Sequence, residues 1–199
     1  MQMGNVDEIK SREGILAKLR SGKTSDSGLP EIPIFSIPGD PIDNFKSKLV
    51  SFDGKYVETA SREDALKWLA EHVDMSTNVY SALTDFPAPY SPDNITDPHD
   101  ANILDVSIAE GELGVGETGS IWVTDESLGL APAALLSTDL ILLLDKKRIV
   151  DGIQDAYEAL DLRSQPYGSF FTGPSATADI EAVHITGAQG EISLTALLY

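Results

Sequence analysis

The sequence predicts an α/β fold, a three-layer sandwich around a largely parallel sheet. Two observations favour this class. Apolar residues at helical spacing alternate along the chain with short runs that are typical of strands. Between Asp139 and Asp145 stands the unbroken apolar run LILLL. Such a run is typical of a strand that helices bury on both faces.

Helices are predicted where apolar residues recur every three or four positions. They begin at Val6, at Pro41, after Ser61 and at Val150. Ser61 is followed three residues later by an aspartate, a variant of the capping box. The segment 22–41 is rich in Gly, Ser and Pro, which predicts an extended connector. The expected organisation is therefore an N-terminal helix and connector over residues 1–41, then an α/β domain over 42–199.

Strands are predicted between these helices. Beside the run 140–144, the candidates are 56–57, 78–80, 103–109, 119–124 and 192–198. The segment 84–101 holds four prolines and is predicted to be a loop.

Composition narrows the class of partners. The chain has 199 residues, and its 32 acidic against 14 basic residues give a formal net charge of −18. This charge disfavours nucleic acids and anionic membranes as partners. There is no cysteine, so the chain has no thiolate for a disulfide or an iron–sulfur cluster. No secretory signal or membrane-spanning run is visible, and we expect a cytoplasmic protein without membrane insertion.

The first loop that could carry chemistry is glycine-rich. It reads EGELGVGETGS and leads into the apolar strand IWV. Its spacing fits neither a Walker A loop nor a dinucleotide fingerprint, because no lysine follows and no helix begins there. A hairpin turn is the favoured interpretation. As a ligand loop, it would offer Gly116, Thr118, Gly119 and Ser120 for binding, and Glu117 as a catalytic base or nucleophile.

The second loop follows Phe171 and begins Gly-Pro-Ser. Ser175 or Thr177 could cap a short helix that begins near Ala176, with Asp179 and Glu181 near its positive end. The same arrangement could bind an anion. Residues alone leave both interpretations open. The ligand-binding candidates in this loop are Gly173, Ser175, Thr177 and Asp179, which lie in the sequence GPSATAD.

The three histidines do not predict a metal site. His72, His99 and His184 are too widely separated to give metal-ligand spacing, so no metal and no cofactor is expected in this chain.

Taken together, the two loops resemble a known family. GETGS, from Gly116, resembles the A-[ED]-T-G-[ST] segment of the LUD domain. GPSATADIE, from Gly173, resembles that family's longer signature G-P-S-x-T-x-D-I-E. The tail GAQG, from Gly187, resembles its G-x-H-G-P ending. The similarity spans about residues 45–199 and is clearest from Ala101 onward.

The resemblance implies a fold of the NagB/RpiA/CoA-transferase type. The chain's length and N-terminal helix are similar to the lactate utilization protein C (LutC or YkgG) group within the family. This implies a part in the oxidation of L-lactate to pyruvate beside two partner proteins, an iron–sulfur protein and an oxidoreductase subunit. A cysteine-free chain would then be a non-redox accessory subunit, and the cluster would lie on a partner.

Two departures from the family pattern bear on function. Ala176 stands where the family often has an arginine, and Gln189 where it often has a histidine. An arginine would clamp a carboxylate or phosphate, so its absence weakens the case for direct anion binding. Two alternatives to the accessory subunit remain. One is an independent enzyme of the sugar-phosphate isomerase or CoA-transferase type acting on a small anionic metabolite. The other is a ligand-sensing module.

Overall fold

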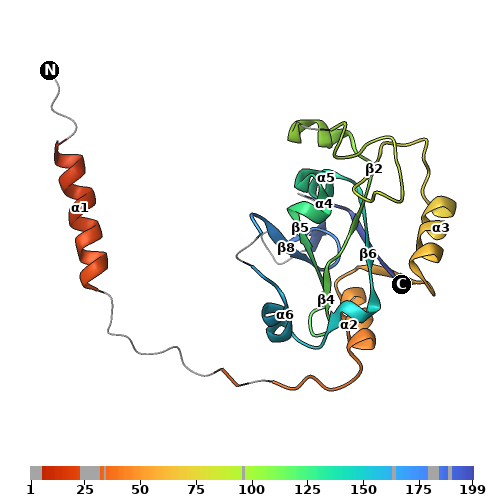
Figure 1. Cartoon of the computed structure of the whole chain (residues 1–199), viewed down its shortest axis with the longest axis horizontal. Helices are drawn as coiled ribbons and strands as arrows, with labels where there is room; N and C mark the ends of the chain where they lie inside the picture. The colour runs from red at the N-terminus through yellow and green to blue at the C-terminus, as the bar shows by residue number, and fades with distance from the viewer. Residues whose placement is uncertain are drawn as a thin grey trace. The chain divides into compact units, whose positions relative to one another are not determined.

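A computed structural model covers the chain (Figure 1). It describes residues 6–22, 32–33, 35–95, 97–162, 165–178, 184–187 and 190–199. The chain divides into two units, Met1–Phe35 and Ser36–Tyr199. In the first unit, helix α1 spans Val6–Ser21, which confirms the predicted helix. The second unit holds the α/β domain.

The centre of the domain is a five-stranded, wholly parallel sheet of order β1-β11-β6-β3-β2. Its strands are β1 (Lys55–Glu58), β2 (Val79–Ser81), β3 (Val106–Glu110), β6 (Asp139–Leu144) and β11 (Ser193–Leu198). The run LILLL forms the middle strand, β6, and is buried along its whole length. The largely parallel sheet and its doubly buried strand are therefore confirmed.

The two faces of this sheet have separate hydrophobic cores. Leu140, Leu142 and Leu144 of β6 point to one core, and Ile141 and Leu143 to the other. This alternation follows from the pleat of a strand. Helices cover both faces, as predicted, and Figure 1 shows α3 on one side with α2, α4 and α5 on the other.

Each of these helices begins at a recognisable capping signal. Helix α3 (Arg62–His72) begins after Ser61, whose side chain accepts a hydrogen bond from the Asp64 amide, and it buries Ala65 and Leu69. Helix α2 (Pro41–Ser51) is capped by Asp40 and buries Phe45 and Leu49. The short helices α4 (Asp125–Leu128) and α5 (Ala131–Leu136) bury Leu128, Ala133 and Ala134.

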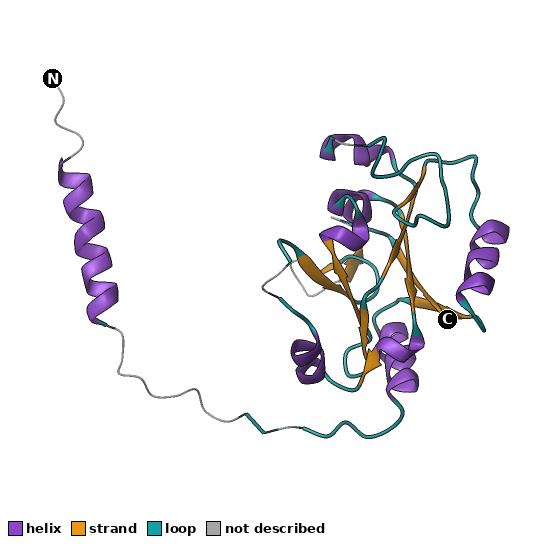
Figure 2. Ribbon diagram, viewed as in Figure 1, coloured by secondary structure: helices purple, strands orange, loops and turns teal. Residues whose placement is uncertain are grey.

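A second sheet packs against the core that α2 also covers, and of its strands only 119–124 was predicted. Its order is β7-β4-β5-β8, with bounds β4 (Leu113–Val115), β5 (Ser120–Thr124), β7 (Ile149–Val150) and β8 (Gly168–Phe171). One face contributes Ile121 and Val123 to the core of the central sheet. The other face packs against α6 (Ile153–Ala159), which lies outside it in Figure 2.

Several predicted boundaries are wrong for physical reasons. The fourth domain helix begins at Ile153 rather than Val150, because Val150 pairs with Val115 in β7. Ile103 ends a 3-10 helix, η1 (Pro98–Ile103), so the strand that follows begins only at Val106. Phe52, expected to share the apolar side of α2, is the exposed residue that ends the helix.

The predicted short helix near Ala176 is also wrong. Ala176–Ala178 forms strand β9, which pairs antiparallel with β10 (His184–Thr186). Backbone bonds to a segment later in the chain replace the local bonds of a helix. No helix in the described part of the chain is long and apolar enough to cross a bilayer.

Candidate functional site

The structure brings the two predicted loops together. Strands β5 and β8 pair antiparallel, with Ile121 opposite Phe171. Ser120, the first residue of β5, therefore lies beside Thr172, which follows β8. The Ser120 hydroxyl forms a 2.5 Å hydrogen bond with the Thr172 hydroxyl and donates to the Thr118 hydroxyl at 2.7 Å. Three hydroxyl side chains thus join the loops at the same edge of the small sheet.

Two glycines let these loops approach the C-terminal half of α2. Gly119 has φ +69°, and a Cβ there would lie 2.8 Å from the Lys48 carbonyl carbon. Gly173 has φ +68°, and a Cβ there would overlap the Phe52 carbonyl oxygen. Both positions combine a left-handed backbone with close backbone approach, which only glycine accommodates. These residues therefore dock the loops against a helix.

Most backbone amides of the first loop already have partners. The amides of Gly116, Glu117 and Gly119 donate at 2.8 Å to the carbonyls of Val150, Asp151 and Val115. Backbone groups bonded in this way are not free to form an oxyanion hole. The hairpin between β4 and β5 accounts for the Gly119 bond, and the other two bonds extend the pairing of β4 with β7.

Glu117 lies at the start of α6, where its carboxylate and that of Asp155 both approach Gly152. Its carboxylate accepts a 3.0 Å hydrogen bond from the Ile153 amide, the first amide of that helix. An anion at a helix N-terminus satisfies an otherwise unpaired donor and interacts favourably with the helix dipole. This contact gives Glu117 a capping role, and it remains an exposed side chain.

The residues of the second loop are distributed between packing and surface positions. Gly173 is buried, Ser175 is partly buried and Thr177 is exposed. The Ser175 amide donates to the Glu191 carbonyl at 3.0 Å, and its carbonyl accepts from the Gly187 amide at 2.7 Å. The candidates Asp179 and Glu181 lie outside the described residues.

A buried carboxyl that sequence reasoning missed lies next to this loop. Glu191 is 4% exposed and lies two residues before β11. Burial raises the pKa of its side chain to about 7. A perturbed carboxyl of this kind is a functional-site signal. The one hint in the sequence was the position of this charged residue directly before the predicted core strand 192–198.

A polar network occupies the carboxyl edge of the central sheet. Arg62, at the start of α3, pairs with Asp85 at 2.8 Å and with Glu110 at 2.7 Å. The Tyr199 hydroxyl accepts from Arg62 at 3.0 Å and donates to Glu110 at 2.6 Å. Hydrogen bonding to Asp85 is the main cause that raises the pKa of Arg62, and Arg62 in turn lowers that of Asp85. Ligands of open α/β sheets bind at this edge, but the guanidinium here is already engaged.

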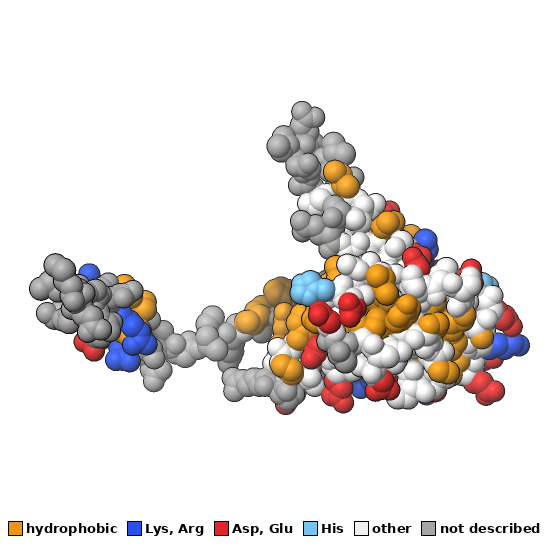
Figure 3. Space-filling view, turned by 90° about the horizontal axis from the view of Figure 1, so that it is seen from above, with side chains coloured by type: hydrophobic (Ala, Val, Ile, Leu, Met, Phe, Trp, Pro, Cys, Tyr) orange, Lys and Arg blue, Asp and Glu red, His pale blue; other side chains and the backbone are white. Residues whose placement is uncertain are grey.

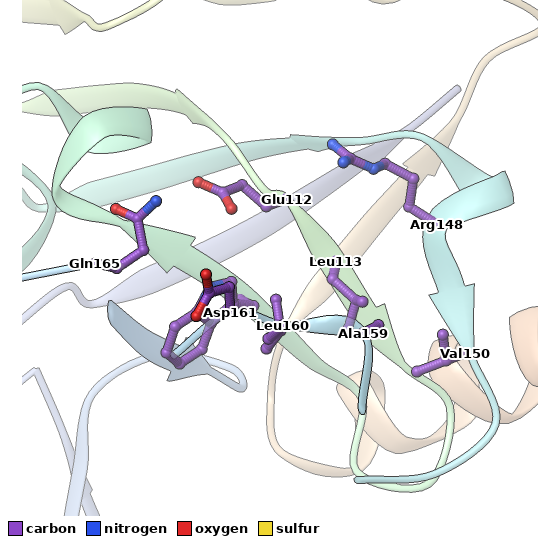
Figure 4. A pocket seen from close by; sticks show the side chains of 9 residues that line it. Glu112, Leu113, Arg148, Val150, Ala159, Leu160, Asp161 and Gln165 are labelled. Carbon is purple, nitrogen blue, oxygen red and sulfur yellow. The ribbon is translucent and has the colours of Figure 1, made fainter. Parts of the chain in front are cut away.

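A cavity of about 310 Å³ opens on the small sheet (Figure 4). Its lining combines charged groups with apolar side chains: Glu112, Leu113, Trp122, Arg148, Val150, Ala159, Leu160, Asp161 and Gln165. Glu112 and Leu113 belong to the glycine-rich loop, but none of the candidate ligand-binding residues of the two loops lines the cavity. The cavity lies within the size range of small-molecule sites.

Two further cavities have a different character. One, of about 460 Å³, lies at the amino edge of the central sheet and includes Asp74, Asp105 and Asp139. Each of these carboxylates accepts a hydrogen bond from the protein. The other, of about 410 Å³, is lined by Pro98, Pro132, Leu135 and Leu136 among others. Figure 3 shows hydrophobic side chains gathered on the face seen from above.

The described residues offer no cluster of three or more His, Cys, Asp or Glu that could hold a metal ion. The expectation that this chain carries no metal therefore rests on the sequence alone.

Comparison with known proteins supplies the family. The model of the LUD domain matches residues 92–199, just over half of the chain. The structure is similar to the crystal structure of a DUF162 family protein from Deinococcus radiodurans, with a TM-score of 0.61 and 14% identity. That likeness covers 79% of this chain and 95% of the other. No curated protein matches the sequence.

The matched range includes both loops, the tail and three of the five strands of the central sheet, β3, β6 and β11. The Deinococcus structure shares the fold, and at its low identity it shows the fold alone. The chain belongs to the LUD domain family, which is associated with lactate utilization.

Proposed function

We propose that this chain is a LutC-like, cytoplasmic component of L-lactate utilization. It acts in the oxidation of L-lactate to pyruvate as a non-redox accessory subunit beside an iron–sulfur partner and an oxidoreductase subunit. The observation that carries the proposal is the match of residues 92–199 to the LUD domain in a chain without cysteine.

The chemistry of the reaction explains the division of labour. Oxidation of L-lactate to pyruvate removes two electrons and two protons from the substrate, so an acceptor must receive them. Iron–sulfur clusters that serve in such transfer are held mainly by cysteine thiolates. This chain has none, so a cysteine-ligated cluster must be carried by a partner protein.

The geometry of the loops supports an accessory role over catalysis by these loops. The amides of Gly116, Glu117 and Gly119 are bonded to backbone carbonyls, and the Glu117 carboxylate caps α6. An oxyanion hole requires donors that point at the reacting atom. This observation disfavours the alternative in which Glu117 and its neighbouring amides form the active site of an independent enzyme.

A growth experiment tests the assignment to lactate utilization. A strain that lacks this chain is grown on L-lactate or on pyruvate as sole carbon source. We expect growth to fail on L-lactate only, and the intact chain supplied in trans to restore it. Pyruvate is the control because it enters metabolism after the proposed step. Equal growth of the two strains on L-lactate contradicts the proposal.

A purification experiment tests the partner. The tagged chain is purified from cells grown on L-lactate and, separately, expressed alone. We expect iron and acid-labile sulfide to accompany the chain only in the first preparation, in a complex with a cysteine-containing protein. The chain contains no cysteine, so iron–sulfur absorbance in the first preparation must come from the partner. A chain that remains alone and iron-free in lactate-grown cells argues against the complex.

A further inference from the structure

In the part of the chain that the structure describes, the cavity on the small sheet is lined by Arg148, which forms no ion pair, and by the carboxylate of Glu112. We propose that it binds a small carboxylate that also carries a hydrogen-bond donor, either a hydroxyl or an ammonium group. This inference goes beyond the proposed function and does not depend on it. It rests on Arg148, Glu112 and Trp122, none of which is among the candidate ligand-binding or catalytic residues of the two loops.

Arg148 supplies the group that would bind the ligand carboxylate. It is the last residue of the 3-10 helix η2 (Lys146–Arg148) and directly precedes β7. Its amide donates to the Asp145 carbonyl at 2.9 Å, which anchors the backbone beneath the side chain. Within the described part of the chain, its guanidinium forms no ion pair. A free guanidinium beside a cavity is suited to bidentate binding of a carboxylate.

Glu112 supplies an acceptor in the same cavity. Its amide donates to the Trp122 carbonyl at 2.8 Å, and its Oε1 accepts a hydrogen bond from the buried Thr124 hydroxyl. Among the described residues no donor is bonded to its Oε2, and Glu112 and Arg148 are not paired with each other. Oppositely charged groups that line one cavity without pairing leave room for a ligand between them.

Apolar side chains complete the wall. Trp122 is 7% exposed, and its ring packs against Phe170 with a centroid separation of 4.8 Å. Leu113 lies opposite Trp122 in the β4–β5 pair. In the view of Figure 4, Glu112 lies between Arg148 and Gln165 along the cavity. This arrangement combines an apolar surface with a few polar groups that fix orientation, as small-molecule sites do.

The balance of charges selects the class of ligand. Arg148 is the one cation among the lining residues, whereas Glu112 and Asp161 are acidic. A ligand with several negative charges, such as a phosphate ester, would meet these carboxylates in a protein that already carries a formal charge of −18. A ligand with one carboxylate and one donor satisfies both Arg148 and Glu112. Hydroxy acids and amino acids have this chemistry.

Binding can be followed through the tryptophan in the cavity. Trp122 and Trp68 are the two tryptophans of the chain, and Trp68 stacks on His72 in α3. In a Trp68→Phe background, the emission reports on Trp122 alone. The probes are L-lactate, L-alanine and propionate; calorimetry supplies an independent affinity. Propionate is the control ligand because it has the carboxylate without the donor.

Arg148→Gln and Lys147→Gln form a matched pair of variants. Both residues are exposed and lie side by side in η2, but only Arg148 lines the cavity. We expect L-lactate or L-alanine to bind, Arg148→Gln to weaken binding by about tenfold or more, and Lys147→Gln to change it less than about twofold. Propionate should bind about tenfold more weakly than the better of the other two probes.

Glu112→Gln tests the second half of the proposal. We expect this variant to bind L-lactate or L-alanine with a smaller advantage over propionate than the parent protein has, while its affinity for propionate stays nearly unchanged. Thermal unfolding of each variant shows whether the fold is retained. No binding of any probe at about 50 mM, or equal losses in the Arg148 and Lys147 variants, overturns the proposal. Growth on L-lactate plays no part in this test, so its failure is distinct from failure of the proposed function.

Discussion

The two sheets of this domain differ in what determines them. The central sheet is set by apolar side chains: β6 is buried along its length and places successive residues in opposite cores. The small sheet is set by glycines, hydroxyl groups and a helix cap, at Gly119, Gly173, Ser120 and Glu117. Hydrophobic burial is nondirectional, whereas close backbone approach and hydrogen bonding require particular residues at particular positions.

This difference explains why the family motifs begin at the turn between β4 and β5 and just after β8. A core strand accepts exchanges among similar apolar residues at modest cost. The turns that join the small sheet to α2 accept only residues that fit the geometry. Residues that look like ligand-binding groups in a linear motif are thus required, in part, by packing. The predictions that follow test this contrast in order of expected effect.

Gly173→Ala should produce the largest effect. The new Cβ would overlap the Phe52 carbonyl oxygen in a residue with φ +68°, so we expect a loss of about 4 kcal/mol in the free energy of unfolding. Gly14→Ala is the control, since a Cβ at Gly14 in α1 has no atom within 4 Å. Denaturant unfolding measures both. A Gly173→Ala protein as stable as the parent would show that this turn is not a packing element.

Glu191 should give stability a distinctive dependence on pH. Burial raises the pKa of its folded-state carboxyl from 4.5 to about 7, so the folded protein holds a proton that the unfolded chain releases. Stability from this group is complete below about pH 4.5 and is lost as the pH rises to about 7. The loss is up to about 3 kcal/mol.

Glu191→Gln removes that proton equilibrium. We expect the variant to match the parent near pH 4 and to be more stable than the parent at pH 8. Glu71→Gln, at an exposed position of α3, is the control. Chemical unfolding at several pH values gives the difference curve. A difference that does not change with pH would contradict a buried, protonated Glu191.

Arg62→Gln tests whether the carboxyl edge of the central sheet depends on its charge network. Removing the guanidinium leaves Asp85 and Glu110 without their shared partner. Since these side chains are about a third exposed or more, solvent screens the pairs, and we expect a loss of about 1 kcal/mol. The effect should shrink in high salt. Lys67→Gln, on the same helix, should leave stability unchanged.

Glu117→Ala should have the smallest effect of the four. It removes the acceptor for the Ile153 amide at the start of α6, and loss of a helix cap costs about 0.5 to 1 kcal/mol. Glu158→Ala, on an exposed position of the same helix, is the control. If both substitutions leave the free energy of unfolding unchanged, the cap contributes no measurable stability.

Much of the central layer could be predicted from the sequence. The run LILLL between two aspartates is typical of a strand buried on both faces, and Ser61 and Pro41 mark helix starts through local chemistry. These signals work because they depend on neighbours in sequence. The meeting of the two loops depends instead on the pairing of β5 with β8, two strands that are far apart in the sequence.

The parts that could not be predicted depend on distant partners. Strands β4 and β9 are three residues long and contain glycine or alanine, so they carry no clear pattern of their own. They become strands because β5, β7 and β10 supply hydrogen bonds. Glu191 was missed for a related reason: burial of a single charged residue follows from how the tail packs, and no local pattern reports it.

The position of β11 has a consequence for biosynthesis. Among the described strands β11 comes last in the sequence, and it lies between β1 and β6 and pairs with both. A nascent chain therefore holds β1 without a partner in the sheet until residues 193–198 have left the ribosome. Unpaired strand edges and exposed apolar faces favour aggregation during synthesis. The central sheet is therefore complete only when β11 pairs with both β1 and β6.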